Sequence, residues 1–344
     1  MNRLSITLLG CIFLFGGFAC SSSPAGQRSA SHARGAPDAR VDALKILDAA
    51  SRSETPLVRA NAIEMLETQV EPLRRAVSRG IVDPNPGVRF AACMALGRQR
   101  LCGIADLTRP LVHDPSESVR AAAIFALAVC NEDIDQTPLA AMVLSTDRAI
   151  RANAAMVLGE IGNPTAAAVL REAMRRPLQR ADADVVRASE LGLAEALVQL
   201  GDRRHLETIR AAFFAPASQS ELTALASQMA GRLQDRSLVP AMAALALAEG
   251  PRQAGPELRL IAAEALARID PTMTLAPLAI ELSQHQFPEV RMQAAFVLAW
   301  DRSAAGLAAL EQLCRDADPR VQVAAAGAVL HRAGLPAHAT AGGP

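Results

Sequence analysis

Apolar residues recur along most of the chain at the spacing of an amphipathic helix. Between Asp114 and Asp147, the stretch SVRAAAIFALAV shows this spacing, NEDIDQ interrupts it, and TPLAAMVLS resumes it. The pattern predicts two helices joined by a short loop. Asp114 and Pro115 are suited to begin the first helix, because aspartate accepts from free backbone amides and proline suits the first helical position. Val and Ile do not alternate with a period of two, so we predict no strands.

The helix pair recurs along the chain. Its second helix carries one phrase, an aliphatic residue, an arginine, two small residues and a leucine, as in VRFAACMALGRQR from Val88 and VRMQAAFVLAWDR from Val290. The anchor of this phrase recurs 30 to 39 residues apart, at Leu66, Leu96, Leu127, Leu158, Leu197, Ala230, Leu266, Leu298 and Leu330. This period predicts an all-α solenoid of about eight or nine stacked pairs. At about 8–10 Å per helix layer, we expect an elongated body about 70–90 Å long.

The consensus of these units, DPxxxVRxxAAxALGxIG, resembles the HEAT-like repeat of the bilin-lyase type, also called the E-Z HEAT repeat. The resemblance covers residues 40–334, is strong around 88–163 and 256–334, and is weaker between 180 and 250, where ELTALASQMAGRL has lost the arginine. It implies a right-handed superhelix whose second helices line a concave face. Most members of the family bind proteins, so we expect a non-catalytic scaffold for a protein or peptide partner. Some members are enzymes, and a HEAT-repeat enzyme or lyase is the alternative.

Candidate chemistry is sparse. The resemblance to deoxyhypusine hydroxylase would require paired His-Glu dipeptides that hold two irons, and none of the six histidines precedes a glutamate. The sequence holds no HExxH, Walker, GxGxxG or GxSxG motif. We therefore expect no catalytic residues, metal, cofactor or small-molecule substrate. The formal net charge is zero, so nothing global attracts nucleic acid. A structural subunit of an envelope complex is a third hypothesis.

Arginines recur near the start of the second helices, often with an aspartate shortly before them, as in DPNPGVR and DPSESVR. A guanidinium forms strong hydrogen bonds with carboxylates. We interpret these arginines as a structural ladder in which each side chain bonds an aspartate or a free carbonyl of the adjoining unit. The alternative is an anion-binding row. The ladder comprises Arg59, Arg89, Arg120, Arg151, Arg187, Arg259 and Arg291.

Second helices also supply the candidate binding face, because their exposed positions form the concave surface of a solenoid. Two residues before the anchors, three consecutive units present Met, Phe and Met, and other apolar or charged residues lie one turn away. A contiguous exposed apolar patch marks an interaction site. The alternative is that these side chains tuck between neighbouring helices. The predicted partner-binding residues are Phe90, Met94, Arg98, Phe125, Val129, Met156, Glu160, Phe296 and Trp300.

Two cysteines lie at opposite ends of one predicted hairpin. Cys102 is at the start of its first helix and Cys130 is at the end of its second. An antiparallel hairpin brings these ends together, so a disulfide is plausible, and two unpaired thiols are the alternative. Cys93 replaces an alanine of the repeat, which predicts a buried thiol. Cys314 ends a first helix and has no evident partner.

The N-terminus has the pattern of an export signal. Arg3 precedes an apolar run from Leu4 to Phe18, which is short for a membrane span. GGFAC followed by serines resembles a bacterial lipoprotein signal, in which the cysteine, here Cys20, is lipidated. LLGC, ending at Cys11, is a second candidate, and an ordinary cleaved signal or an uncleaved anchor are alternatives. We expect a signal peptide over 1–19, a lipidated linker over 20–38, the solenoid over 39–334 and a disordered tail over 335–344. The predicted location is the periplasmic side of an envelope membrane.

Overall fold

The computed structural model describes residues 36–176, 178, 181–250 and 253–335, and its regular structure is entirely helical. Within these residues no strand occurs, and the helices follow one another in sequential pairs. The all-α prediction is confirmed. The predicted signal peptide, Cys20 and residues 336–344 of the predicted tail lie outside the described residues, and the first helix begins at Ala36, inside the predicted linker.

Each pair consists of a first helix and a longer or better-buried second helix. The first helices are α1 (Ala36–Ala50), α3 (Val70–Gly80), the 3-10 helix η2 (Cys102–His113), α6 (Pro138–Val143), α8 (Ala167–Arg175), α10 (Leu206–Phe213), α12 (Val239–Leu247), α14 (Ala276–Leu282) and α16 (Ala304–Leu313). The second helices are α2 (Pro56–Met65), α4 (Pro86–Arg98), α5 (Glu117–Val129), α7 (Arg148–Ile161), α9 (Ala183–Gln199), α11 (Ser220–Leu233), α13 (Pro256–Ile269), α15 (Pro288–Leu298) and α17 (Pro319–Gly334). Short 3-10 turns precede some helices, namely η3 (Pro164–Ala166), η4 (Arg203–His205), η5 (Ala217–Gln219) and η6 (Arg236–Leu238).

The helix termini follow from local sequence, with one correction. The side chain of Asn85 accepts from the amide of Gly87 at the start of α4, and Gly162 ends α7 with a left-handed φ of 75°. Asp114 does not begin α5, because that helix starts at Glu117. The carboxylate of Asp114 instead accepts from the amide of Ser116 and from an arginine of the preceding pair, so it organises the loop before the helix.

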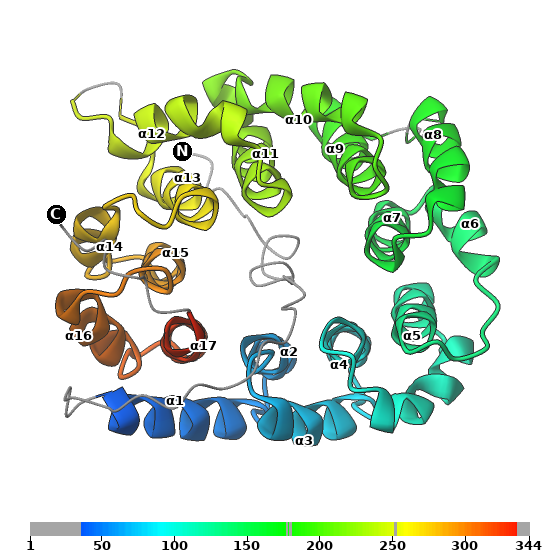
Figure 1. Ribbon diagram of the computed structural model, residues 1–344, viewed down its shortest axis with the longest axis horizontal. Coiled ribbons are helices and arrows are strands. Elements are labelled where there is room, and N and C mark those ends of the chain that lie inside the picture. Colours follow the sequence, from blue (N-terminus) through cyan, green and yellow to red (C-terminus); the bar gives the residue numbers. More distant parts are fainter. Residues whose placement is uncertain (1–35, 177, 179–180, 251–252, 336–344) are drawn as a thin grey trace, which may run out of the picture.

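The helix pairs stack in a closed ring (Figure 1). Each second helix packs against the second helices of the neighbouring pairs, and α17 packs against both α1 and α2. In Figure 1 the second helices lie on the inside of the ring and the first helices lie on the outside. The elongated body that the repeat count predicts is therefore wrong, because the rotation between successive repeats brings the two ends of the stack together.

The core runs continuously around the ring. All nine anchor positions of the repeated phrase are buried, and so are the paired alanines Ala154–Ala155 and Ala294–Ala295. Small residues set the spacing of the helices. At Gly231 on α11, an added Cβ would lie 3.0 Å from the Cα of Ala265 on α13, so these backbones are in direct contact. The repeated phrase is therefore a packing motif of the second helices.

Candidate protein-binding site

Four of the predicted partner-binding side chains belong to the core. The exposed fraction is 4% or less for Phe90, Met94, Phe125 and Phe296. The expectation that they form an exposed patch is wrong, because a second helix is covered by its own first helix and by second helices on both sides. Phe125 illustrates the packing. Its ring lies over Gly97 of α4, where an added Cβ would come within 2.4 Å of a ring carbon.

The other predicted binding residues are half-buried: Arg98, Val129, Met156, Glu160 and Trp300. Three successive second helices, α7, α9 and α11, keep more of their inner side chains accessible. Their half-buried or exposed residues lie three and seven positions apart, a spacing that places them on one face of each helix. We call this surface the inner stripe, and it comprises Asn153, Met156, Glu160, Gly192, Glu195, Gln199, Leu225, Gln228 and Arg232.

The inner stripe ends where equivalent positions become buried. On α4 the corresponding residues Ala91 and Met94 are buried, and on α13 they are Ile261 and Glu264, with exposed fractions of 2% and 4%. Because neighbouring helices cover the other sides of α7, α9 and α11, the accessible side of each faces the interior of the ring. The repeated phrase alone does not distinguish these helices from α4 and α5, where the sequence predicts the exposed side chains.

A buried cluster of charges borders one end of the inner stripe. Arg98 on α4 donates to both carboxylate oxygens of Glu160 on α7, at 3.0 and 2.7 Å, and thereby reaches across α5. Its other terminal nitrogen lies 3.6 Å from Glu67. The side chain of Arg98 is only 8% exposed. Arg98 therefore links its own repeat to the preceding repeat, through Glu67, and to the repeat two units further on, through Glu160.

The cluster shifts the ionisation of its members. Burial lowers the pKa of Arg98, but the carboxylates of Glu160, Glu67 and Glu64 outweigh this effect and raise it. Burial raises the pKa of Glu64 to about 8, against the opposing effect of Arg98. Burial also raises the pKa of Glu67. Glu64 is therefore largely protonated at neutral pH, and Arg98 faces fewer negative charges than the sequence suggests.

A second group of polar and aromatic side chains lies on α13, α15 and α17. The guanidinium of Arg268 lies 5.5 Å from the ring centre of Trp300 and 2.9 Å from an oxygen of Glu264. The ring of His331 lies 4.7 Å from that of Trp300 in an edge-on arrangement. Burial, assisted by the charge of Arg268, lowers the pKa of His331 to about 4. His331 is therefore neutral at physiological pH, and the group links three adjacent second helices.

The arginines of the predicted ladder bond loops of adjoining pairs. Arg89 donates to both oxygens of Asp114, at 2.8 and 2.9 Å, and to the carbonyl groups of Asp83 and Pro84 in its own loop. Arg59 makes the same contacts one repeat earlier, to Asp83, and Arg291 makes them to Asp316. Because these guanidinium groups already donate to carboxylates and carbonyls, they favour the structural interpretation over an anion-binding row.

Four ladder arginines depart from this geometry. Arg120 bonds Glu117 on its own helix at 2.7 Å, and Arg187 donates to the side-chain oxygen of Gln219 at 2.8 Å. Arg151 donates to the carbonyl groups of Ala173 and Arg176, and Arg259 to that of Ala246. In the unit that has lost the arginine, Arg210 of α10 bonds Asp235 at 2.7 and 2.8 Å. This pair is not among the predicted ladder residues, although its separation of 25 residues equals that of Arg89 and Asp114.

The ladder lowers the pKa values of its aspartates. Burial raises the pKa of Asp114, but hydrogen bonds from Arg89 and the Ser116 amide outweigh it and hold the pKa below its usual value. The same balance lowers the pKa of Asp83, with Arg59 as the partner. For Asp235 the hydrogen bond from Arg210 is the largest effect, and its pKa is also lowered. These carboxylates are ionised over the physiological range.

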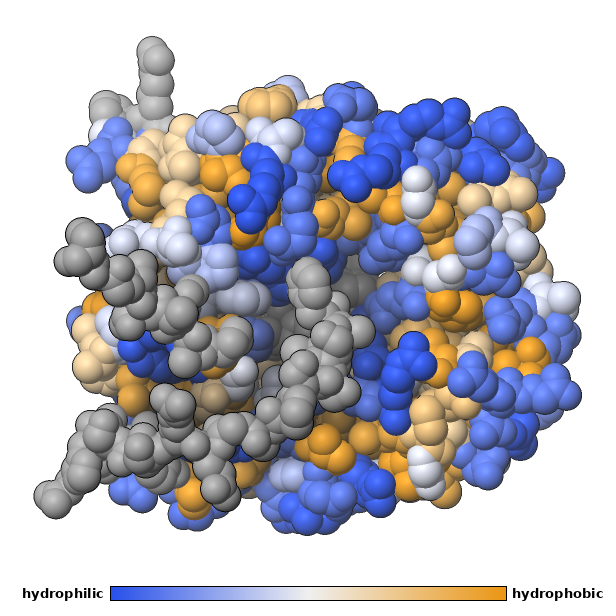
Figure 2. Space-filling view, viewed as in Figure 1, coloured by the Kyte–Doolittle hydropathy of each residue, from blue (hydrophilic) through white to orange (hydrophobic). Residues whose placement is uncertain are grey.

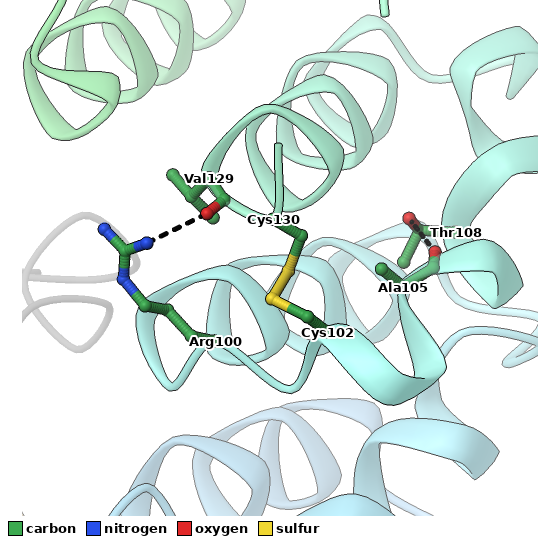
Figure 3. The surroundings of a disulfide bond; sticks show 6 residues. All are labelled: Arg100, Cys102, Ala105, Thr108, Val129 and Cys130. Atoms are coloured by element: carbon green, nitrogen blue, oxygen red, sulfur yellow. Dashed lines mark hydrogen bonds between the residues drawn. A yellow bond between two sulfur atoms is a disulfide. The ribbon is translucent and has the colours of Figure 1, made fainter. Parts of the chain in front are cut away.

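A disulfide joins Cys102 of η2 to Cys130 at the end of α5 (Figure 3), with a Cα–Cα distance of 5.3 Å. Nearby, Arg100 donates to the carbonyl group of Val129, and the hydroxyl of Thr108 donates to that of Ala105. The bridge holds a first helix that is 3-10 rather than α and contains Pro110, which has no amide hydrogen to donate. The disulfide therefore joins this irregular first helix to the second helix of the same pair.

Two further cysteines of the described chain are not in disulfides. Cys93 is buried and Cys314 is half-buried, and burial raises the pKa of both thiols, that of Cys314 to about 12. The described residues contain no cluster of three or more His, Cys, Asp and Glu side chains that could hold a metal ion. In the same part of the chain, no helix is both long and apolar enough to span a bilayer.

On the face of the ring seen in Figure 2, hydrophilic and hydrophobic residues are intermixed over the described helices. Large apolar side chains that are exposed lie apart from one another in the sequence: Val41, Val70, Val82, Leu107, Phe214, Leu247 and Phe287. Scattered apolar residues of this kind are common on protein surfaces, so they do not define a binding site.

The stacked helix pairs and their buried phrase define an α-solenoid, here closed into a ring. The family model of HEAT repeats matches residues 104–194 and 275–339, so these two segments are similar to HEAT repeats. A solved structure of an engineered protein is similar over 87% of this chain and 94% of its own, at 16% sequence identity and a TM-score of 0.32, which is too low to support any argument. A comparison with curated proteins finds no match.

Proposed function

We propose that this chain is a non-catalytic scaffold that binds a segment of a partner protein along the inner stripe. The proposal is supported by one observation above all. On α7, α9 and α11 the two inner positions that correspond to Ala91 and Met94 of α4 remain half-buried, whereas on α4, α5, α13 and α17 both are buried. HEAT repeats generally bind proteins, and an extended concave surface is the part of a solenoid that they use.

The chemistry of the inner stripe suits a polypeptide segment. Asn153, Gln199 and Gln228 offer amide groups that both donate and accept hydrogen bonds, as a peptide backbone requires. Met156 offers a flexible apolar contact. The charges are held in fixed positions, because Arg232 donates to Glu195 at 2.7 and 2.9 Å and Arg98 donates to Glu160. A peptide therefore meets a surface whose polar groups are already positioned.

A photocrosslinking amino acid at Gln228 tests this proposal. In native membranes we expect it to form a discrete adduct with a partner protein. The matched control carries the same amino acid at Glu207, which lies on the outer helix α10 and has a side chain that is 76% exposed. The variant Met156→Glu should weaken formation of the Gln228 adduct while leaving the melting temperature nearly unchanged. Adducts that form equally well at Glu207, or that persist in Met156→Glu, would refute the inner stripe as the binding site.

We further propose that the protein is an envelope lipoprotein anchored through Cys20. Support comes from the sequence of the signal and from the disulfide, which is a bond typical of oxidising compartments. The variant Cys20→Ser should no longer incorporate labelled palmitate and should move from the membrane to the soluble fraction. Cys11→Ser is the control. If Cys11→Ser loses the label and Cys20→Ser keeps it, lipidation at Cys20 is ruled out.

A further inference from the structure

We infer that the ring opens at the junction between α17 and the α1–α2 pair, which we call the seam. This inference goes beyond the proposed function, because it concerns how the ring exchanges between two states. The seam joins the last described helix pair to the first, so no loop among the described residues crosses it. The other junctions between neighbouring pairs are crossed by the chain itself, which keeps their helices together even when side-chain contacts break.

The arginine ladder does not continue across the seam. The residue of α17 that corresponds to Arg89 is Gln322, which donates to the carbonyl group of Asp316 in its own loop as Arg89 does to that of Asp83. Gln322 carries no guanidinium, and the loop before α2 reads SRSET and offers no aspartate. The nearby Arg320 bonds Asp318 at 2.6 Å and Glu289 of α15 at 3.2 Å, both on its own side of the seam. The seam therefore lacks the arginine–aspartate hydrogen bonds that Arg59, Arg89 and Arg291 form at other junctions.

Internal junctions that lack an arginine–aspartate pair are held by other side-chain contacts. Between α5 and α7, the amide of Asn153 donates to Ser118 at 2.8 Å. Between α13 and α15, Arg268 lies over the ring of Trp300. The seam is thus set apart both by the missing loop and by the missing ladder contact.

Apolar packing holds the seam closed, and it depends on one glycine. Met65 of α2 lies against Gly327 of α17, where an added Cβ would lie 2.5 Å from the sulfur and 2.8 Å from the Cβ of Met65. A shallow pocket between α2, α15 and α17, lined in part by Asn61, Phe296 and Val323, lies at the same junction.

Both sides of the seam are apolar, unlike the polar outer faces that cap open solenoids. On α1 the side chains of Ala43 and Leu47 are fully buried, and on α17 so are Val321 and Ala325. Opening exposes these surfaces to water, which favours the closed ring and makes the open state transient. A reversible opening at the seam gives lateral entry to the interior for a segment that has no free end.

The native thiol of Cys314 reports on the seam. It lies at the end of α16, and the charge of Asp42 on α1 acts on it across the junction. The variant Gly327→Ala places a methyl group against Met65 and should raise the rate of Cys314 alkylation about tenfold, while Cys93 in the core stays protected. Mass spectrometry of peptides separates the two rates.

The matched control is Gly231→Ala, which crowds Ala265 across the internal junction of α11 and α13. It should leave the Cys314 rate unchanged. In the unmodified protein, low concentrations of urea should raise the Cys314 rate before the Cys93 rate. The inference is overturned if Gly327→Ala leaves Cys314 unchanged, if Gly231→Ala raises its rate equally, or if Cys314 and Cys93 become reactive at the same urea concentration.

Discussion

The bond between Arg89 and Asp114 provides a quantitative test of the ladder. The variant Arg89→Met keeps much of the apolar stem and removes the guanidinium. Asp114, whose side chain is 4% exposed, then loses two charge-assisted hydrogen bonds. Breaking a buried ion pair from one side destabilises a protein by about 3–5 kcal/mol. Because the side chain of Arg89 is itself 15% exposed, we expect a loss of about 3 kcal/mol.

The matched control is Arg52→Met. Arg52 bonds Asp48 at 2.9 Å, but the two side chains are 57% and 39% exposed. A surface pair of this kind contributes at most about 1 kcal/mol. Urea unfolding followed by circular dichroism, with the disulfide intact, measures both variants, and a double-mutant cycle with Asp114→Asn isolates the pair. If Arg89→Met is no more destabilising than Arg52→Met, the ladder is not a stabilising structure.

The same variant has a predictable dependence on pH. In the folded protein Arg89 helps to hold the pKa of Asp114 below its usual value. A lowered pKa contributes stability that is complete above the unfolded pKa of about 3.9 and is lost as the pH falls through the folded value. The difference in stability between the wild type and Arg89→Met should therefore shrink below about pH 4. A difference that stays constant down to that range would show that the charge of Asp114 is not involved.

Three further changes test other parts of the structure. Burial raises the pKa of Glu64 to about 8, so the wild type should lose stability as the pH rises from about 4.5 to 8, and Glu64→Gln should gain relative to it by up to about 4 kcal/mol in urea unfolding. Removing the bridge with Cys130→Ser should destabilise the protein by roughly 3–4 kcal/mol, and thiol counting on the denatured, unreduced wild type should find Cys102 protected. Phe125→Glu should unfold the α4–α5 region in hydrogen exchange, because it replaces an aromatic ring packed on Gly97 with a carboxylate that loses its hydration when buried; an intact exchange pattern would contradict its place in the core.

The sequence determines the local parts of this account well. Helix pairs, buried anchors and the arginine–aspartate bonds all follow from spacing within one or two units, as Arg89 and Asp114 show. The accessibility of Phe125 does not, because it depends on Gly97 of the neighbouring helix and on which sides of α5 are covered. For the same reason the sequence could not tell the half-buried Met156 from the buried Met94, which occupies the same repeat position.

Ring closure depends on a quantity that no single repeat reveals. The rotation between neighbours must add up around the whole stack until α17 meets α1 and α2. A small difference per repeat would give an open superhelix, as the periodicity alone predicts. The contact of Gly327 with Met65 could not be predicted from the sequence, because the two residues lie near opposite ends of the chain.

The most direct test of the closed ring is an intramolecular crosslink across its ends. The variant Asp42→Cys places a thiol on α1 at a position whose charge acts on the native Cys314 at the end of α16. A short bis-maleimide should join residues 42 and 314 within one monomer, seen as a faster-migrating band and as a linked peptide by mass spectrometry. The control Glu207→Cys, on α10 across the ring, should give no link to Cys314. If Asp42→Cys also gives no link in the monomer, or gives only links between copies, the repeats form an open solenoid rather than a ring.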